Sequence, residues 1–213
     1  MKINYNYTTF FTFVNNLWDN EYMVKIFYIL KRVNKGKIGD LPKHIVEHCN
    51  KFHHDDELIT SLFTYSLLSE LLTKFNRNIN ELSFSSNGKP IIPNGYISVS
   101  HSRNYSLVSY SDIVHGIDIE KECGRRNVVK LMSKYFLNQY EELSFEGLEK
   151  EQQKSIFYSL WTKKEAFVKM NDGNILIRDE KFLNENIRYI TFEKDGYNIS
   201  VCAKNEFIIE NMS

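Results

Sequence analysis

Two acidic side chains lie two positions apart in the segment GIDIEKE, residues 116–122. The isoleucines around them predict a strand, in which side chains at positions i and i+2 point to the same face. Asp118 and Glu120 are therefore expected side by side, where two carboxylates repel each other unless a positive group lies between them. The pair fits a cation site or, alternatively, the end of an acidic edge strand at the surface.

A third acidic side chain comes from WTKKEAFVK, residues 161–169, whose pattern predicts a helix. Trp161, Glu165 and Lys169 are spaced by four residues and share one helix face. A small set of carboxylate ligands favours Mg²⁺ or Mn²⁺, which usually shares the phosphate oxygens of a substrate. The alternative is a plain ion pair between Glu165 and Lys169.

Groups that could bind a phosphate precede the acidic strand. Lys89 lies in the turn NGKP, residues 87–90, and a lysine ammonium binds phosphate as a point charge. Ser100 and His101 follow at the end of a predicted strand, and both can donate a hydrogen bond to a phosphate oxygen. Each of these residues alone also fits an ordinary turn, so the indication comes from their occurrence together with the three carboxylates.

The elements that must position these side chains follow from apolar spacing and turn residues. Asp55 or Asp56 is expected to cap the second helix, and His101 and Ser102 are expected at the bend between two strands. Strands are expected at 22–30, 96–100, 105–111 and 114–120, and in a hairpin over 188–203 that turns near Asp195 and Gly196. Helices are expected at 42–52, about 56–72, 127–145 and 155–170.

Composition limits the class of protein. The 213 residues can form one large domain or two half-domains. A net charge of zero gives no overall field that would favour nucleic acid or an anionic membrane. No apolar run reaches the roughly 20 residues of a membrane span. Three cysteines without a close pair, and no N-terminal targeting pattern, predict a cytoplasmic protein.

Two other chemistries fit the sequence less well. HIVEH, residues 44–48, has the spacing of a zinc-hydrolase helix, with Cys49 nearby but no third ligand identifiable by spacing. Ser100 beside His101 could suggest acyl transfer, but neighbouring strand residues point to opposite faces and no G-x-S-x-G motif is present. The usual glycine-rich phosphate loops are also missing, so phosphate binding would depend on side chains and a metal.

The motifs NGKP, ISVSHS, GIDIE and FYSLWTKKEAFVK, in this order and spacing, resemble those of the 4'-phosphopantetheinyl transferases of the surfactin-synthetase-activating (Sfp) type. The resemblance covers roughly residues 50–205, with a weaker echo in YNISVCAK. It implies an α+β (α/β) fold of two similar half-domains, residues 1–112 and 113–213, with pseudo-twofold symmetry and the active site at their interface.

The implied reaction is transfer of 4'-phosphopantetheine from coenzyme A to a serine of an apo acyl or peptidyl carrier protein, with release of 3',5'-ADP. The resemblance implies that Asp118, Glu120 and Glu165 bind Mg²⁺, with Mn²⁺ as an alternative. It also implies that Lys169 contacts the transferred phosphate. A monomer is expected, because two half-domains build their own interface. The alternative function is a non-catalytic relative that binds coenzyme A or a carrier protein as a regulator.

The resemblance also indicates where coenzyme A binds. Trp161 resembles a supporting aromatic residue of the motif. Thr60 stands where an arginine for the 3'-phosphate is expected, whereas His48, Lys51 and His54 offer basic groups nearby. The remaining coenzyme A contacts implied by the motifs are Lys89, Ser100 and His101.

The base that deprotonates the carrier serine is left open between two candidates. In the family a glutamate of the helix after the acidic strand has this role, and here Tyr140 stands at its position with Glu141 one residue later. A slip of one residue turns a helical side chain by about 100°. Glu141 and a water held by the metal both stay candidates.

A surface for the carrier protein is expected on RRNVVKLMSKYF, residues 125–136. Carrier proteins are typically acidic, and basic residues around an apolar patch could attract and dock such a partner. The alternative is an ordinary solvated helix face. The residues concerned are Arg125, Arg126, Val129, Lys130, Leu131, Met132 and Lys134.

Overall fold

The computed structural model describes residues 23–51, 54–123, 128–136, 145–172 and 186–213. Its helices are α1 (Lys43–Cys49), α2 (Asp55–Thr73), α3 (Val128–Tyr135) and α5 (Lys150–Asn171). Its strands are β1 (Val24–Arg32), β2 (Ser83–Phe84), β3 (Pro90–Ile91), β4 (Tyr96–Ser102), β5 (Tyr105–Ser111), β6 (His115–Lys121), β7 (Arg188–Lys194), β8 (Tyr197–Ala203) and β9 (Phe207–Asn211). Short 3-10 turns cover Lys35–Lys37 and Ile79–Glu81.

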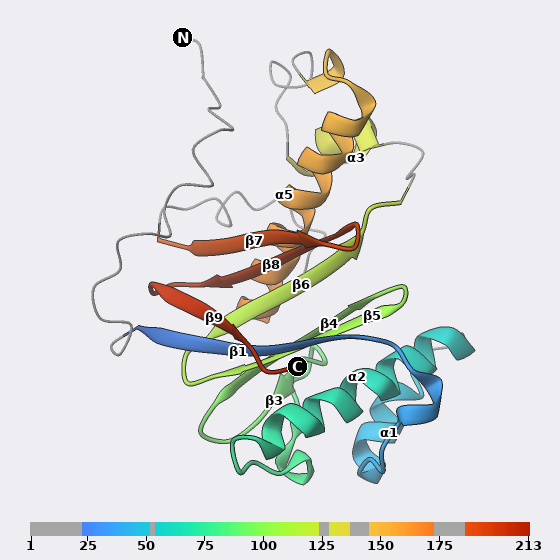
Figure 1. Cartoon of the computed structure of the whole chain (residues 1–213), viewed down its shortest axis with the longest axis vertical. Coiled ribbons are helices and arrows are strands. Elements are labelled where there is room, and N and C mark those ends of the chain that lie inside the picture. Colours follow the sequence, from blue (N-terminus) through green and yellow to red (C-terminus); the bar gives the residue numbers. More distant parts are fainter. Residues whose placement is uncertain (1–22, 52–53, 124–127, 137–144, 173–185) are drawn as a thin grey trace.

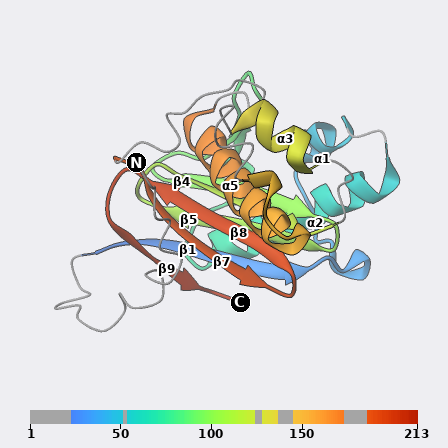
Figure 2. The same ribbon diagram turned by 90° about the horizontal axis from the view of Figure 1, so that it is seen from above.

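Two main sheets lie between helices, with α1 and α2 on one side and α5 on the other (Figure 1). The first sheet has the strand order β4-β5-β1-β9 and the second has the order β6-β8-β7. Seen from above, α5 lies over β8 (Figure 2). This is the mixed α+β architecture that the sequence predicts.

The same order of elements occurs in both sheets. A strand is followed by a helix and a hairpin, and the strand pairs antiparallel with the second arm of that hairpin: β1 with β5, and β6 with β8. This order is what two similar half-domains would give. The pseudo-twofold symmetry itself stays a prediction.

The last strand returns to the first sheet. β9 pairs with β1 in parallel, so the C-terminal residues extend the sheet of the N-terminal half. A strand here is missing from the sequence-based expectations, because FIIEN is short and does not alternate between apolar and polar residues. The division of the chain into residues 1–112 and 113–213 stays a prediction.

The two faces of β6 have different surroundings. Ile117 and Ile119 are buried in an apolar cluster with residues of β1, β5 and β8, between the two sheets. Alternation along the strand therefore turns Gly116, Asp118 and Glu120 to the other face, which α5 covers. The acidic pair lies between a strand and a helix.

Alternate serines join the edges of the two sheets. β4 and β6 are edge strands, and hydroxyl oxygens of β4 accept hydrogen bonds from backbone amides of β6. These side chains take the place of a backbone ladder and satisfy buried amides. The pairs are Ser98 with Ile117 at 3.2 Å, Ser100 with Ile119 at 3.4 Å, and Ser102 with Lys121 at 3.0 Å.

Gly116 allows α5 to lie against β6. A Cβ atom at this position would lie 1.9 Å from the carbonyl oxygen of Ala166 and 2.7 Å from the amide nitrogen of Met170. Both atoms belong to the helix backbone, so they cannot turn away as a side chain would. The glycine therefore sets the distance at which Glu165 and Lys169 meet the acidic strand.

Two turn predictions have different outcomes. The turn at Asp195 and Gly196 is confirmed, with φ of 54° and 73°, as a two-residue hairpin requires. The bend at His101 and Ser102 is wrong, since both lie within β4 and pair with β5. The turn is at Arg103 and the residue after it, because two-residue loops match the twist of the strands.

Two helix boundaries also differ from the predictions. α2 begins at Asp55, and its N-cap is His54, which makes no side-chain capping bond. The predicted aspartate cap is therefore wrong. Asp55 and Asp56 lie in the first turn of the helix, where their negative charges interact favourably with the helix dipole. α5 begins earlier than expected because Glu149 and Gln152 form a capping box. The predicted extension of the third helix to residue 145 lies mostly outside the described residues.

Within the described ranges we find no helix with the length and apolar character that a membrane span requires.

The contact at Gly116 predicts a large effect of a small substitution. Gly116→Ala is expected to lower the free energy of unfolding by about 3 kcal/mol, because backbone atoms must move to admit the methyl group. Urea denaturation measures this. Gly36→Ala is the control, since its Cβ would lie 3.5 Å from the nearest atom. Equal losses in both variants would contradict the close contact.

His115, the first residue of β6, is a buried histidine. Its side chain is 1% exposed, and its ring nitrogens lie 2.7 Å from Ser109 Oγ and 3.0 Å from the carbonyl oxygen of Ile113. Burial lowers its pKa to about 4. The ring is therefore uncharged in the folded protein at neutral pH.

This burial predicts a loss of stability in mild acid. Between the unfolded pKa near 6.5 and the folded pKa of about 4, the unfolded state binds more protons, so stability falls as the pH is lowered. His115 is expected to contribute a loss of about 3 kcal/mol across this window. Urea denaturation at several pH values should show a smaller loss for His115→Asn. Exposed His54→Asn is the control, and an equal pH dependence for both variants would count against this role.

Candidate active site

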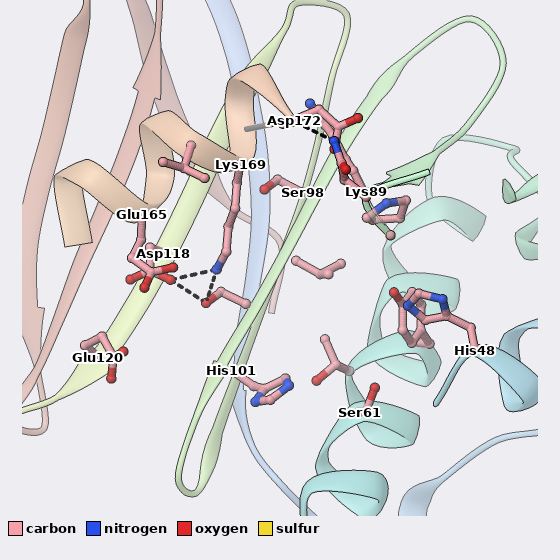
Figure 3. Close-up of a pocket in the computed structure, with 18 residues that line it drawn as sticks. His48, Ser61, Lys89, Ser98, His101, Asp118, Glu120, Glu165, Lys169 and Asp172 are labelled. Carbon is pink, nitrogen blue, oxygen red and sulfur yellow. Dashed lines mark hydrogen bonds and ion pairs between the residues drawn. The ribbon is translucent and has the colours of Figure 1, made fainter. Parts of the chain in front are cut away.

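A pocket of about 370 Å³ lies between α2 and α5, along β4 and β6 (Figure 3). Side chains from both faces of β4 reach it, because the strand runs between the two helices. Residues that the sequence places in separate motifs meet here. They are Lys89, Ser100, His101, Asp118, Glu120, Glu165 and Lys169.

A buried ion pair forms the centre of the pocket. Lys169 Nζ lies 2.7 Å from Asp118 Oδ1 and donates a hydrogen bond to Ser100 Oγ at 2.8 Å. Ser100 in turn donates to Asp118 Oδ1 at 2.8 Å. The Asp118 side chain is 4% exposed and that of Lys169 is 29% exposed. Lysine, serine and aspartate thus form a closed triangle (Figure 3).

The charges of this triangle depend on each other. Burial raises the pKa of Asp118 above its usual range, and the attraction of Lys169 opposes this only in part. Burial alone would lower the pKa of Lys169, but Asp118 and then Glu165 hold it above its ordinary value. Lys169 is therefore protonated at neutral pH. It is a positive group of the kind that the paired carboxylates of β6 require.

Glu120 and Glu165 complete the acidic lining. Glu120 Oε2 accepts a hydrogen bond from Ser102 at 3.0 Å. Glu165 lies one helical turn before Lys169, on the side of α5 that faces Asp118 (Figure 3). The sequence-based expectation that one strand and one helix bring three carboxylates to the same pocket is thus met.

These carboxylates suit a hard cation. Asp118 Oδ2 is buried and has no hydrogen-bond partner among the described residues, so one oxygen is left for a ligand. Carboxylate oxygens are the donors that Mg²⁺ prefers. Yet in the described ranges no three His, Cys, Asp or Glu side chains are close enough together to hold a metal as they stand. A cation would share Asp118 with Lys169.

Lys89 holds the end of α5. Its Nζ donates to the carbonyl oxygen of Met170 at 2.9 Å, one of the carbonyls that the end of a helix leaves without an intrahelical partner. Asn87 and Ser85 bond to Asp172 beside it. Burial lowers the pKa of Lys89. Its place in the pocket agrees with the sequence, while its predicted contact with coenzyme A stays a prediction.

His101 lies across β4 from Ser100, on the side of α2 (Figure 3). Burial first, and the charge of Lys169 second, lower its pKa. The ring is therefore mostly neutral at neutral pH and can donate only one N–H. Its contact with coenzyme A also stays a prediction.

The structure adds polar residues of α2 that sequence reasoning missed. They are Ser61, Thr64 and Tyr65, which line the pocket from the helix. Ser61 donates to Cys49 Sγ at 3.2 Å, and Thr64 Oγ1 lies 2.9 Å from Ser106 Oγ. The sequence feature that could have indicated these pocket residues is the presence of polar side chains on an otherwise apolar helix face.

Two of the expected coenzyme A contacts lie away from the pocket. Lys51 and His54 are exposed and do not line it. Thr60 is buried and bonds to the carbonyl of Asp56 at 2.7 Å, so Ser61 faces the pocket instead. A one-residue step turns a helical side chain by about 100°, which explains the difference. Glu141 and Tyr140 lie outside the described residues.

The two histidines of the HIVEH helix point to different partners. His44 Nε2 lies 2.9 Å from the carbonyl oxygen of Leu82. His48 stacks on Phe84, with ring centroids 3.7 Å apart, and lines the pocket. This arrangement does not favour the zinc-hydrolase alternative.

Trp161 packs away from the pocket. It contacts Tyr135, Phe136 and Phe157 in an apolar cluster between α3 and α5. Its role is therefore to support the helix that carries Glu165 and Lys169.

Comparison with known proteins shows which family part of the chain resembles. Residues 115–207 match the family model described as the 4'-phosphopantetheinyl transferase superfamily. This stretch contains Asp118, Glu120, Glu165 and Lys169. These residues are therefore similar to that superfamily, and the resemblance drawn from the motifs is confirmed.

The similarity extends beyond the matched stretch. The chain is 27% identical over 183 residues to "4'-phosphopantetheinyl transferase ffp" of Bacillus subtilis, covering 74% of this chain and 79% of the relative. It is 25% identical over 190 residues to "4'-phosphopantetheinyl transferase Sfp" of Bacillus subtilis (strain 168), covering 78% and 84%. A shorter stretch of 108 residues is 32% identical to "4'-phosphopantetheinyl transferase HetI" of Nostoc sp., covering 47% and 45%.

The buried ion pair predicts an unequal effect of two lysine substitutions. Lys169→Met leaves Asp118 buried beside an apolar group and is expected to lower the free energy of unfolding by about 3 kcal/mol. Lys31→Met removes an exposed ion pair with Glu70 and is expected to lower it by less than about 1 kcal/mol. Urea denaturation measures both.

A double variant tests whether the loss comes from the uncompensated charge. Adding Asp118→Asn to Lys169→Met removes that charge and should restore part of the lost stability. Equal losses for the two lysine variants, or no recovery in the double variant, would argue against a buried ion pair.

Proposed function

We propose that the protein transfers 4'-phosphopantetheine from coenzyme A to a serine of an apo acyl or peptidyl carrier protein, releasing 3',5'-ADP. The observation that supports this most strongly is the pocket in which Lys169 meets Asp118, lined also by Glu120 and Glu165. These residues lie in the stretch that matches the superfamily model. The similar proteins from Bacillus subtilis are both named 4'-phosphopantetheinyl transferases.

In this proposal Asp118, Glu120 and Glu165 would hold Mg²⁺, with Mn²⁺ as an alternative. The unpartnered Oδ2 of Asp118 supports this assignment. When bound, the ion would neutralise charge on the diphosphate of coenzyme A. Lys169 lies beside the same carboxylate and is protonated at neutral pH, so its ammonium is suited to hold the phosphate that is transferred.

The transfer forms one bond and breaks another. The carrier serine oxygen bonds to the phosphorus on the pantetheine side, and the bond from that phosphorus to the bridging oxygen breaks. The bridging oxygen leaves with 3',5'-ADP. The serine proton must be removed, and Glu141, which lies outside the described residues, stays the side-chain candidate for this base.

The surface for the carrier protein is narrower than the sequence suggests. Met132 is 0% exposed and packs in the core cluster under α3, so its predicted place in a docking patch is wrong. Helical spacing explains this, since Met132 faces α5. Lys130 and Lys134 are exposed on α3 and are the described basic residues that would face an acidic carrier. Arg125 and Arg126 lie outside the described residues.

The alternative is a regulator that binds coenzyme A or a carrier protein without catalysis. Binding alone would not need three carboxylates and a protonated lysine to line one pocket. The meeting of all three acids and Lys169 in one pocket favours the enzyme.

The proposal predicts a gain of mass on a carrier protein. We expect the intact chain, with coenzyme A and Mg²⁺, to add phosphopantetheine to apo acyl or peptidyl carrier domains, measured by mass spectrometry. Chelation by EDTA should stop the reaction, and excess Mg²⁺ should restore it. Asp118→Asn should slow transfer by about 10²-fold or more, whereas the exposed Asp112→Asn should not.

Two results would oppose the proposal. No mass gain on any of several acyl and peptidyl carriers would reject the transferase activity. Binding of coenzyme A without transfer would support the regulator instead.

A further inference from the structure

Serine hydroxyl groups of β4 both accept and donate hydrogen bonds. Each oxygen accepts an amide hydrogen bond from β6, which leaves the hydroxyl hydrogen to donate elsewhere. Ser100 donates to Asp118 and Ser102 donates to Glu120. Ser98 accepts the amide of Ile117 in the same way. It lies two residues before Ser100 in β4. The three serines therefore share one structural role, and two of them have a second contact.

The hydroxyl of Ser102 is held in a single direction. Its oxygen accepts the Lys121 amide at 3.0 Å and donates to Glu120 Oε2 at 3.0 Å. Because the amide fixes the oxygen, the donated hydrogen fixes one oxygen of the Glu120 carboxylate. The carboxylate that is held in this way lines the pocket.

Asp118 and Glu120 differ in how they are held. Asp118 is buried and receives hydrogen bonds from both Ser100 and Lys169. Glu120 is half-buried, has one more rotatable bond, and gains a fixed orientation from a hydroxyl on the neighbouring sheet. Loss of that hydroxyl would remove a contact that orients one oxygen of Glu120.

We propose that Ser102 is a positioning residue that orients Glu120 for a divalent cation. The inference rests on the proposed function, in which Glu120 is a ligand of that cation. Groups that hydrogen-bond to metal ligands orient them, and their removal typically weakens metal affinity by about 10–100-fold. Ser102 would act through Glu120 and would not contact the cation itself.

The test compares two serines of the same strand. Ser102→Ala removes an amide contact and the carboxylate contact, whereas Ser98→Ala removes an amide contact without touching an acidic ligand. Binding of Mn²⁺ to the intact chain is followed by the electron paramagnetic resonance signal of the free ion, with and without coenzyme A. Thermal unfolding without metal reports the structural effect of each change.

We expect Ser102→Ala to weaken Mn²⁺ binding by about 10-fold or more and Ser98→Ala to change it by less than about 2-fold. Both should lower the unfolding temperature by similar amounts. Ser102→Thr keeps the hydroxyl and should restore most of the affinity. In transfer assays Ser102→Ala should need more Mg²⁺ for half-maximal rate, with much of kcat recovered at saturating Mg²⁺.

Two results would overturn the role of Ser102. One is an unchanged Mn²⁺ affinity in Ser102→Ala. The other is an equal loss in Ser98→Ala, which would mean that the strand contact alone matters. If the unaltered chain binds no Mn²⁺ with or without coenzyme A, the metal site of the proposed function fails, and the role of Ser102 fails with it. The first two results leave the transferase proposal intact.

Discussion

The contact between the edge strands β4 and β6 is the constraint on which the rest of the structure depends. An edge strand exposes amides that must find acceptors when they are buried. Here side-chain hydroxyls accept them in place of a backbone ladder. Because a hydroxyl both accepts and donates, the contact that joins the sheets also orients Asp118 and Glu120. The same serines therefore belong both to the contact between the sheets and to the acidic site.

The second constraint is the distance between α5 and β6. Gly116 lets the helix backbone approach the strand so closely that a methyl group would overlap the carbonyl oxygen of Ala166. At this distance Lys169 reaches Asp118 and balances a charge that burial alone would not tolerate. Lys89 fixes the far end of the helix through Met170. The lysines hold the pocket together in this structure, and one of them is also suited to phosphate.

Local patterns in the sequence were sufficient for the geometry within each element. The alternation of a strand places Asp118 and Glu120 on one face, and the spacing of four in a helix places Glu165 and Lys169 on another. Turn residues identify the hairpin at Asp195. The same rules predict the ends of elements less well, because capping and strand pairing compete there. For this reason the sequence-based predictions of the β4–β5 bend and of the α2 cap were wrong.

The sequence by itself determined which residues share a face, which groups carry charge, and which family the motifs resemble. The tertiary structure decided what each face meets. Ser98, Ser100 and Ser102 alternate visibly in the sequence, but their partners on β6 depend on which sheet edges come together. Whether position 60 or 61 of α2 faces the pocket depends on how the helix is rotated on its sheet. Such long-range contacts arise from packing between elements, which periodicity along the chain does not encode.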